Sequence, residues 1–249
     1  MAKIGLQLYS IKEECQKDFL GTLRRVAEIG YTGVEFAGYF DTSADELQSL
    51  LDEINLFPAG AHINIRLLEN DLDNVIAYAK TIGCPAVICP SFRIDETNLA
   101  GTFNTIAELF NRVGQACDAN GLQFQYHMHG HEFVPVGETT GMQMLLDKTD
   151  PDLVWFEPDT TWVEKAGVRV VQFIEEHGPR VSYIHLKDFT DRTSWHDTEI
   201  GAGQLDTPGV IAAANKFNLP WYIVEQEAYD MPMMESIGIS LKNLRQLIG

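Results

Sequence analysis

The chain has 249 residues and 45% of them are hydrophobic, so it is long enough to bury a sizeable core. It carries 36 acidic against 18 basic residues, a formal net charge of −18, which argues against nucleic acid or an anionic membrane as a partner because both need a basic surface. The chain has no apolar run near the roughly 20 residues of a membrane span, no secretory segment at its start and no CxxC spacing among its four cysteines, so we expect a cytoplasmic protein with reduced thiols.

Strand and helix signals alternate along the whole chain. The first helix stops at Gly30, and Ser43 with Glu46 forms a capping-box pattern before the second. The predicted strands cover residues 3–8, 33–37, 57–63, 86–89, a stretch that begins at 123, then 153–156, 181–186 and 222–225. The predicted helices cover residues 16–29, a segment after 43, then 71–82, 96–120, 141–147, 168–177, 207–217 and 233–248.

This succession predicts an α/β protein with the (β/α)8 TIM-barrel fold, whose usual size of about 250 residues it matches. A doubly wound parallel sheet is the alternative. It is disfavoured because the first strand ends LQLYSIKEE, with no glycine-rich phosphate turn. No linker or low-complexity segment interrupts the chain, so we expect a single domain over residues 1–249.

The stretch QFQYHMHGHEF at residues 123–133 reads first as a strand and then as a loop. Its apolar residues alternate with two amides and then with His127 and His129, a period of two. Imidazole is a common ligand for divalent metals, so two on one strand face can converge on an ion. The alternative is a half-exposed strand whose polar face meets water.

Polar or ionisable side chains end six of the predicted strands. In a TIM barrel the chemistry lies at these carboxyl ends. Burial directly after an apolar strand costs free energy unless the group is paired or binds a metal. The residues are Glu35, His62, His127, His129, Glu132, Glu157, Asp159, His185, Lys187, Asp188, Glu225 and Glu227.

Alternation along the strands places several of these side chains on faces that can point inward together. His185 and Lys187 share one face of the seventh strand, and Asp159 and Glu225 lie on the corresponding faces of the sixth and eighth. With an imidazole from the fifth strand they can surround one ion. Oxygen ligands combined with imidazole suit Mn²⁺, Mg²⁺, Co²⁺ or Zn²⁺.

Several of these residues also have a purely structural interpretation. Glu35 can accept hydrogen bonds from loop amides, and His62 can be a packed, hydrogen-bonded histidine of the barrel wall. Glu157 can be the buried partner of a lysine or arginine. Asp159 can cap a helix, and Asp188 can be a loop or capping residue.

Short motifs along nearly the whole chain carry a resemblance to a known family. They are IGLQLYS at the start, YTGVEFAG around Glu35, YHMHGHEF, PDTTW, IHLKD, GAGQLD at 201–206 and IVEQE. The chain resembles the xylose-isomerase-like TIM-barrel superfamily in its sugar phosphate isomerase/epimerase branch. That branch includes D-tagatose 3-epimerase, inosose dehydratase and, more distantly, endonuclease IV.

The resemblance implies one divalent ion held by Glu, Asp, His and Glu from strands five to eight. Asp159 matches the Asp, His185 the His and Glu225 the last Glu. The Glu of strand five falls on His127, so the chain departs from the pattern there. We therefore expect His127, Asp159, His185 and Glu225 as metal ligands, with His129 in reserve and Mn²⁺ as the first choice of ion.

The resemblance further implies a metal-dependent isomerase or epimerase that removes the proton next to the carbonyl of a keto-sugar or related small-molecule carbohydrate. Loss of a β-substituent after the same proton abstraction would make it a lyase or dehydratase of a keto-sugar, keto-glycoside or inosose. This is the alternative, because His127 replaces one of the two glutamate bases. Glu225, Lys187 and His129 are the acid–base candidates.

Lys187 has two opposed interpretations. Burial near a divalent cation would lower its pKa and let it exchange a proton near neutrality, or the charged ammonium could hold an oxyanion. A salt bridge to Glu157 or Glu227 would instead keep Lys187 charged and structural.

Aromatic and polar groups around the strand ends predict how a carbohydrate would be held. Trp162 and Trp195 can supply flat walls for a sugar ring. Glu35, His62 and Glu132 can bind hydroxyl groups. Trp195 has packing within its own loop as the alternative.

Two other classes of function fit parts of the pattern. A nuclease like endonuclease IV would need a richer set of metal ligands and a less acidic chain. A sugar-binding protein without turnover would keep the pocket and lose the chemistry. A homo-oligomer is compatible with the superfamily, although no interface stands out in the sequence.

Overall fold

The computed structural model describes residues 2–249, and in this range eight parallel strands form a nearly closed barrel. The strand order is β8-β5-β4-β3-β2-β1-β12-β9. Single bridges from Phe156 to Val181 and from Asp159 to His185 join the two outer strands of that order. The barrel strands are β1 (Lys3–Gln7), β2 (Gly33–Phe36), β3 (Phe57–His62), β4 (Ala86–Cys89), β5 (Gln123–Met128), β8 (Val154–Pro158), β9 (Tyr183–Leu186) and β12 (Trp221–Val224).

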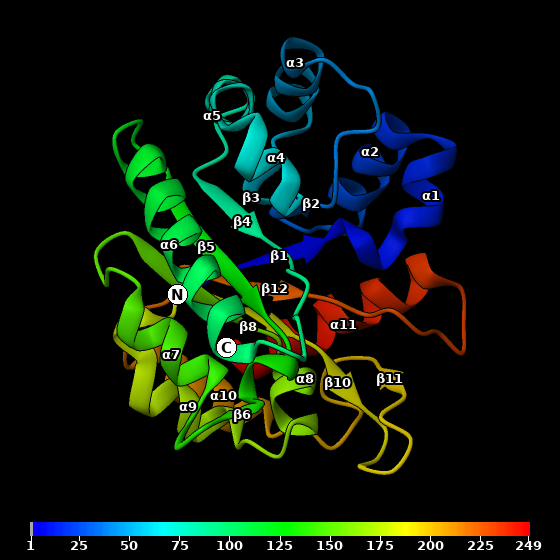
Figure 1. The fold of residues 1–249 in the computed structure, drawn as a ribbon. Coiled ribbons are helices and arrows are strands. Elements are labelled where there is room, and N and C mark those ends of the chain that lie inside the picture. The colour runs from blue at the N-terminus through cyan, green and yellow to red at the C-terminus, as the bar shows by residue number, and fades with distance from the viewer. Residues whose placement is uncertain (1) are drawn as a thin grey trace.

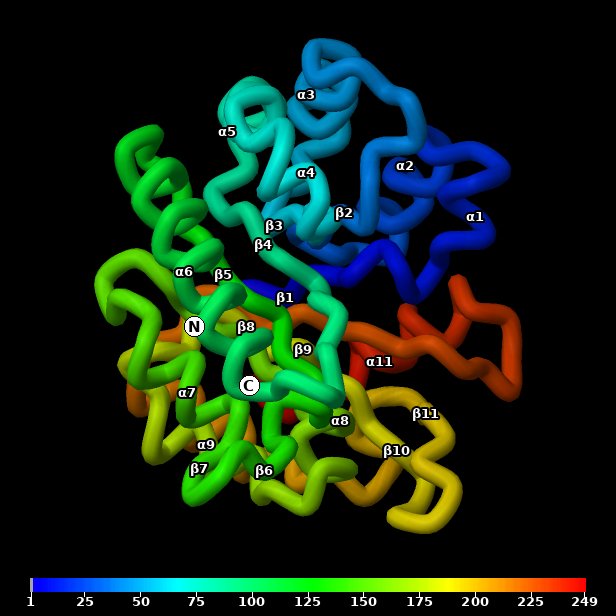
Figure 2. Tube along the Cα trace, in the orientation of Figure 1, coloured from blue at the N-terminus to red at the C-terminus, as the bar shows by residue number. Residues whose placement is uncertain are grey.

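Helices surround the strands, and the chain passes round the ring in order of sequence (Figures 1 and 2). Two short hairpins, β6 (Pro135–Val136) with β7 (Thr139–Thr140) and β10 (Asp188–Phe189) with β11 (Asp197–Thr198), lie in loops that follow barrel strands. The helices are α1 (Lys12–Lys17), α2 (Phe19–Ile29), α3 (Ala44–Ile54), α4 (Ile65–Asn70), α5 (Leu72–Thr81), α6 (Leu99–Asp118), α7 (Gly141–Lys148), α8 (Thr160–Lys165), α9 (Val170–His177), α10 (Thr207–Asn215) and α11 (Met233–Ile248).

The TIM-barrel prediction is therefore confirmed, with local differences in the helices. The helix predicted over 16–29 is two helices, because Asp18 adopts an extended conformation and caps α2 by accepting a hydrogen bond from Gly21. The predicted cap at Ser43 is present, since its side chain accepts from the N–H of Glu46. Two short helices, α4 and α8, are absent from the prediction. Each has only one or two turns and begins at a residue whose side chain caps it, Asn64 for α4 and Asp159 for α8.

Strand alternation divides the core as expected. The interior of the barrel holds a small apolar cluster that comprises Ala59, Ala86, Ile88, Tyr183, Trp221 and Ile223. The apolar residues of β5 belong instead to the larger core shared with the helices, so His127 is left on the inner face. Polar side chains occupy the inner positions further along the strands, which places the chemistry at the carboxyl ends.

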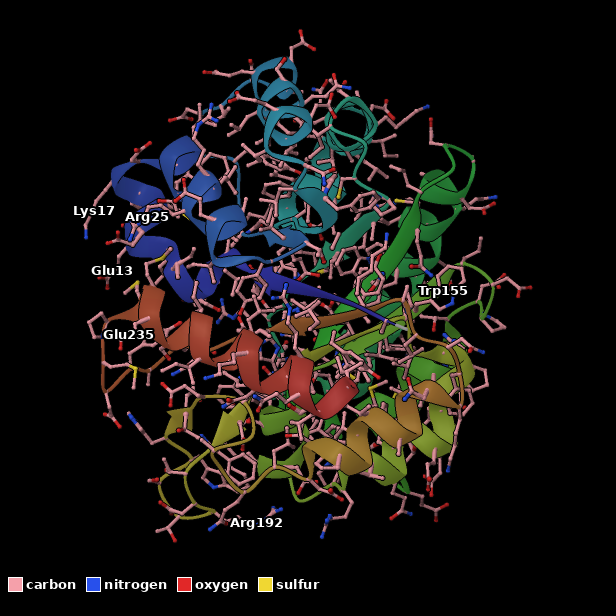
Figure 3. All side chains as sticks on the ribbon, turned by 180° about the vertical axis from the view of Figure 1, so that it is seen from behind. Glu13, Lys17, Arg25, Trp155, Arg192 and Glu235 are labelled. Carbon is pink, nitrogen blue, oxygen red and sulfur yellow. The ribbon has the colours of Figure 1, made fainter. Side chains whose placement is uncertain are left out.

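Charged side chains project outward, Lys17 and Arg25 from helices α1 and α2 and Arg192 from the loop between β10 and β11 (Figure 3). Some form surface ion pairs, for example Arg25 with Glu14 at 2.7 Å. Across residues 2–249 the helices are all too short or too polar to cross a bilayer.

Candidate functional site

Four side chains converge at the carboxyl ends of neighbouring strands. His127 lies near the end of β5, Asp159 follows β8, His185 lies in β9 and Glu225 follows β12. All four are buried, and each offers a ligand atom within 4.8 Å of those of the others. The Nδ1 atom of His185 lies 3.1 Å from Oε2 of Glu225. The structure thus brings together the four residues predicted as ligands, which we call the candidate metal site.

The contacts of Asp159 test whether these residues fit a cation. Its Oδ1 accepts a hydrogen bond from the N–H of Trp162 at 2.9 Å, so Asp159 does cap a helix, α8. Its Oδ2 is buried and has no hydrogen-bond partner in residues 2–249. Lys187 Nζ approaches this oxygen only to 3.6 Å, beyond hydrogen-bond distance. A buried carboxylate oxygen without a donor is costly, and two imidazoles with two carboxylates form a suitable donor set, so the residues fit a divalent metal.

Glu35 lies on the other side of the His185 ring. Its Oε1 accepts a hydrogen bond from Gln7 at 2.7 Å and lies 2.7 Å from Nε2 of His185 and 2.8 Å from Nε2 of His62. Burial opposes its ionisation, yet the two imidazoles hold the pKa of Glu35 well below its usual range. The ionised carboxylate thus fixes the His185 ring with Nδ1 directed at Glu225.

The structure corrects the predicted partner of Glu157. Its carboxylate meets histidines rather than a lysine or arginine: Oε2 lies 3.2 Å from both His127 Nδ1 and His185 Nε2, and 3.4 Å from His62 Nε2. Burial and the nearby Glu35 raise the pKa of Glu157. The reason is that imidazoles surround the Glu157 carboxylate inside the barrel, whereas Lys187 lies beyond the end of β9 and nearer the mouth.

In the metal-free protein the pKa of Lys187 is raised, whereas the lowering predicted beside a bound cation stays a prediction. Burial alone would lower it, but the carboxylates of Glu225, Asp159 and Glu227 outweigh burial and raise the pKa of Lys187 well above its usual value. Its Nζ lies 3.6 Å from Glu225 and donates a hydrogen bond to Glu227. The alternative of a salt bridge to Glu227 is therefore confirmed, and the side chain is held as an ammonium ion.

The imidazoles of the site differ in charge: His127 and His129 are neutral at neutral pH, whereas the carboxylates of Glu157 and Glu35 outweigh burial and raise the pKa of His185 well above its usual value. Burial, reinforced by neighbouring imidazoles, lowers the pKa of His127 well below its usual value, and burial lowers that of His129 to about 4. Neutral imidazole is the form that binds metals. Burial raises the pKa of Asp159 to about 7, although Lys187 acts in the opposite direction. In the metal-free protein a proton therefore competes with a cation for this carboxylate.

The predicted hydroxyl-binding residues have contacts within the protein. Glu132 is buried, and its carboxylate accepts hydrogen bonds from the Tyr126 hydroxyl and from the N–H of His129, so it holds the loop that follows β5. Glu35 is committed to Gln7 and to imidazoles, as described above. His62 keeps 10% of its side chain exposed and lines a cavity.

The two predicted aromatic walls have different surroundings. Trp162 is half-buried in α8, with its ring centre 5.8 Å from Lys187 Nζ and 5.8 Å from the ring centre of His129. With His129 it lines a cavity of about 510 Å³ beside the candidate metal site. Trp195 packs on Phe189, with the ring centres 4.6 Å apart, in the loop that joins β10 and β11.

Asp188 explains why IHLKD and GAGQLD occur together. Its carboxylate accepts hydrogen bonds from the N–H groups of Gly201, Gly203 and Leu205 at 2.9 to 3.1 Å. A Cβ on Gly203 would lie 2.3 Å from Oδ1 of Asp188, so this approach requires glycine. The motif pair therefore fixes the loop after β9, as the loop assignment of Asp188 predicts.

Comparison with protein families identifies the lineage. The model of the xylose isomerase-like TIM barrel family matches residues 23–247. The chain belongs to this family. Among curated relatives, an inosose dehydratase of Bacillus anthracis is 31% identical over 249 residues, with 85% of this chain and 83% of the relative covered. An inosose dehydratase of Geobacillus kaustophilus is 23% identical over 188 residues and covers 67% of this chain; the chain spans only 60% of that relative's length.

Solved structures of other proteins share the fold over the whole chain. A sugar phosphate isomerase/epimerase from Parabacteroides distasonis superposes with a TM-score of 0.85 at 21% identity and full coverage of both chains. The IOLI protein, solved with a zinc atom bound, superposes with a TM-score of 0.75 at 13% identity, covering 99% of this chain and 98% of its own. These neighbours therefore show that the fold is shared, and one of them was solved with a zinc atom bound.

Two features of the mouth escape the sequence reasoning. Gln7 is fully buried and donates to Glu35, and the polar residue within the apolar run IGLQL is the signal that could reveal it. The tyrosines at 9, 39 and 78 line one cavity although they come from three separate segments. No local pattern joins residues so far apart in sequence.

Proposed function

We propose that this protein is a metal-dependent enzyme that removes the proton next to the carbonyl group of a mostly neutral carbohydrate. The observation that carries the proposal is the convergence of His127, Asp159, His185 and Glu225 around a buried, unsatisfied carboxylate oxygen at the carboxyl ends of the strands. The names of the relatives and neighbours support carbohydrate chemistry.

The proposed cofactor is one divalent cation held by these four residues. A mixed nitrogen and oxygen donor set suits Mn²⁺, our first choice, and also Zn²⁺ or Co²⁺. The zinc in the IOLI structure supports binding of a divalent ion by a protein of this fold. When bound, such an ion polarises the carbonyl and a neighbouring hydroxyl and acidifies the carbon beside them.

The protein's own groups would then move the protons. The Glu225 carboxylate accepts the proton from the substrate carbon, and Lys187, held as an ammonium ion beside it, donates to the oxygen that gains charge or departs. Trp162 forms a wall for the ring. We assign Glu35 and Glu132 to holding His185 and the loop after β5, because their carboxylates are already occupied there.

Two outcomes follow from the same proton abstraction. We place β-elimination first, because a charged lysine beside a single carboxylate base suits protonation of a departing hydroxyl and because relatives named inosose dehydratase support it. Isomerisation or epimerisation, the first choice from the sequence, is the second candidate. Neutral His129 supports it, since its imidazole on the β5 side could serve as a second acid–base group.

The test is incubation of the Mn²⁺-loaded protein in D₂O with a panel of inososes, ketoses and 3-keto-glycosides. Deuterium uptake followed by an absorbing enone identifies a lyase, and uptake with an altered stereocentre or carbonyl position identifies an isomerase or epimerase. Metal-free protein and the Asp159→Ala variant are the controls. A saturable thermal shift without deuterium uptake on any compound would overturn the enzyme proposal and indicate a sugar-binding protein.

A further inference from the structure

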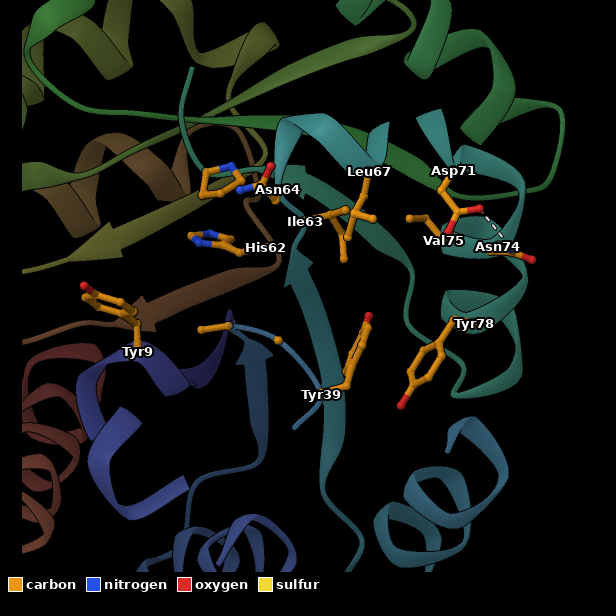
Figure 4. Close-up of a pocket in the computed structure, with 13 residues that line it drawn as sticks. Tyr9, Tyr39, His62, Ile63, Asn64, Leu67, Asp71, Asn74, Val75 and Tyr78 are labelled. Atoms are coloured by element: carbon orange, nitrogen blue, oxygen red, sulfur yellow. Dashed lines mark hydrogen bonds between the residues drawn. The ribbon is translucent and has the colours of Figure 1, made fainter. Parts of the chain in front are cut away.

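A large cavity lies at the mouth of the barrel on the side formed by β1 to β4. It has a volume of about 590 Å³, within the roughly 300 to 1,000 Å³ of pockets that hold drug-sized ligands. Its walls come from the ends of β1 and β3, the loop after β2, and helices α4 and α5 (Figure 4). The four residues of the candidate metal site lie on the opposite strands, so the cavity is an addition to that site.

The cavity carries exposed apolar surface that the fold does not need. Tyr9 is 42% exposed and Leu67 45% exposed, and both line it. They are two of the five large hydrophobic side chains that the described residues leave exposed, the others being Phe57, Met231 and Leu247. Exposed apolar groups gathered in a concave surface indicate a ligand site rather than chance exposure.

Stacked aromatic rings form one wall of the cavity. The rings of Tyr39 and Tyr78 lie 4.0 Å apart between centres and are inclined by 21°. The Tyr78 hydroxyl donates to the carbonyl of Thr42 at 2.8 Å, and Tyr39 packs on Phe36. The wall is thus held in place before any ligand arrives, and pre-organised aromatic faces favour a flat apolar ligand.

His62 connects the cavity to the chemistry. Its side chain lines the cavity, and its Nε2 lies 2.8 Å from Glu35, whose carboxylate also holds His185. In Figure 4 the His62 ring stands between Tyr9 and the tyrosine wall. A substrate whose reacting ring lies at the candidate metal site can therefore extend past His62 into the cavity.

The lining argues against a phosphate group as the occupant. In the part of the chain that the structure describes, this cavity is lined by no lysine or arginine, and Asp71 contributes a carboxylate at its rim. A phosphate would meet negative charge in a protein whose net charge is already −18. A neutral apolar group meets the tyrosine and leucine surface without such a cost.

We propose that the cavity binds an aromatic group carried by the carbohydrate, so that the preferred substrate is an aryl-substituted carbohydrate rather than a bare or phosphorylated sugar. This rests on the proposed function only in placing the sugar ring at the candidate metal site. The aryl group would lie between Leu67 and the wall of Tyr39 and Tyr78. The polar groups of Asn64 and Asn74 at the rim can bond hydroxyls on that ring.

The test compares binding of phenyl and methyl glycosides of glucose, galactose, mannose and xylose to the Mn²⁺-loaded protein by calorimetry. Burial of a phenyl group should make at least one phenyl glycoside bind about 10-fold or more tightly than its methyl counterpart. Leu67→Ser should bring this ratio near one. Leu247→Ser is the matched control, because Leu247 is 40% exposed on α11, away from the cavity, and the ratio should stay unchanged. Tyr78→Leu is a second cavity variant, should Leu67→Ser not fold.

Any other result would contradict the proposed role of the cavity. Equal affinity for phenyl and methyl glycosides, or no binding of any phenyl glycoside, would overturn the proposal. A phenyl preference that survives both cavity variants would place the aryl group elsewhere and overturn it too. Because the experiment measures binding, it tests the cavity even if no compound is turned over. Turnover of free ketoses or inososes without a preference for phenyl glycosides would overturn the role of the cavity and leave the proposed function intact.

Discussion

The mouth of this barrel has two unlike halves. On the side of β5, β8, β9 and β12, ionisable side chains crowd together, and Lys187 by itself forms ion pairs with three carboxylates. On the side of β1 to β4, the loops and helices form a cavity of about 590 Å³ whose walls are tyrosine, leucine and valine. His62 stands at the boundary, bonded to Glu35 on one side and exposed to the cavity on the other.

The difference indicates that chemistry and recognition are separated. The polar half has buried donors and acceptors that an apolar ligand could not satisfy, which supports the proposed metal with an oxygen-rich group there. The other half offers little beyond apolar surface, so it can contribute affinity and choice of substrate. Changes in the polar half should therefore abolish turnover, whereas changes in the other half should alter which carbohydrate is used.

The largest effect is expected from removal of a metal ligand. Asp159→Ala or Glu225→Ala should lose the bound ion and reduce activity by at least about 100-fold, because each removes a proposed carboxylate ligand and Glu225 is also the proposed base. Elemental analysis of the purified variants measures the metal. Asp197→Asn is the control, since Asp197 is also buried but accepts hydrogen bonds from the N–H groups of Glu227 and Ala228 instead. Full metal retention in both ligand variants would refute the site.

Lys187→Met should lower the turnover number by about 100-fold with the metal still bound, because it removes the charged acid beside Glu225. Metal content and melting temperature are checked first, since the variant leaves carboxylates without their cation. Lys216→Met is the matched control, as Lys216 forms a surface pair with Glu175. A turnover number within a few-fold of the parent protein would restrict Lys187 to a structural role.

Metal affinity should depend on pH through Asp159. Burial raises the pKa of its carboxyl group to about 7, so below that pH the metal must displace a proton. The affinity should then fall by a further factor of about 10 for each pH unit below 7. Above pH 7 this contribution of Asp159 is lost and the slope is smaller, because only the proton on His185, whose pKa the carboxylates of Glu157 and Glu35 raise well above its usual value, still has to be displaced. Titration of the metal-free protein with Mn²⁺ at pH 5.5, 6.5 and 8 measures the change in slope. One constant slope across this range would contradict the assignment.

Sequence patterns predict much of this molecule because they are local or periodic. Alternation along β5 places His127 inside the barrel, and the parity of β9 places His185 there too. This parity shows which side chains can converge, and the family resemblance then names the four candidate ligands. The cap at Ser43 is equally local. The helices α4 and α8 are too short to produce an apolar period, which is why they escape prediction.

Electrostatics and cavities depend on residues that are distant in sequence. The pKa of Lys187 rises because Glu225 and Glu227 follow β12 while Asp159 follows β8, and their combined effect exceeds that of burial. The contacts of Glu157 with histidines likewise depend on distant residues, because closure of the barrel decides which side chains of different strands lie next to one another. The cavity needs α4 and α5 to fold over β3. Spacing along the chain contains none of this information.

The smallest effect is expected at the boundary of the polar half. Trp162→Ala should raise the Michaelis constant of the true substrate by roughly 5-fold and change the turnover number little, because a ring wall contributes about 1 kcal/mol of contact and no proton transfer. The N–H of Trp162 that donates to Asp159 belongs to the backbone, so the ligand geometry is kept. Trp155→Ala is the control, since Trp155 lines a cavity with residues that begin β5 and precede β12, at the other end of the barrel (Figure 3). An unchanged Michaelis constant for Trp162→Ala would refute the role of Trp162 as a wall for the sugar ring. A fall in turnover number with loss of metal would show instead that the indole supports the candidate metal site.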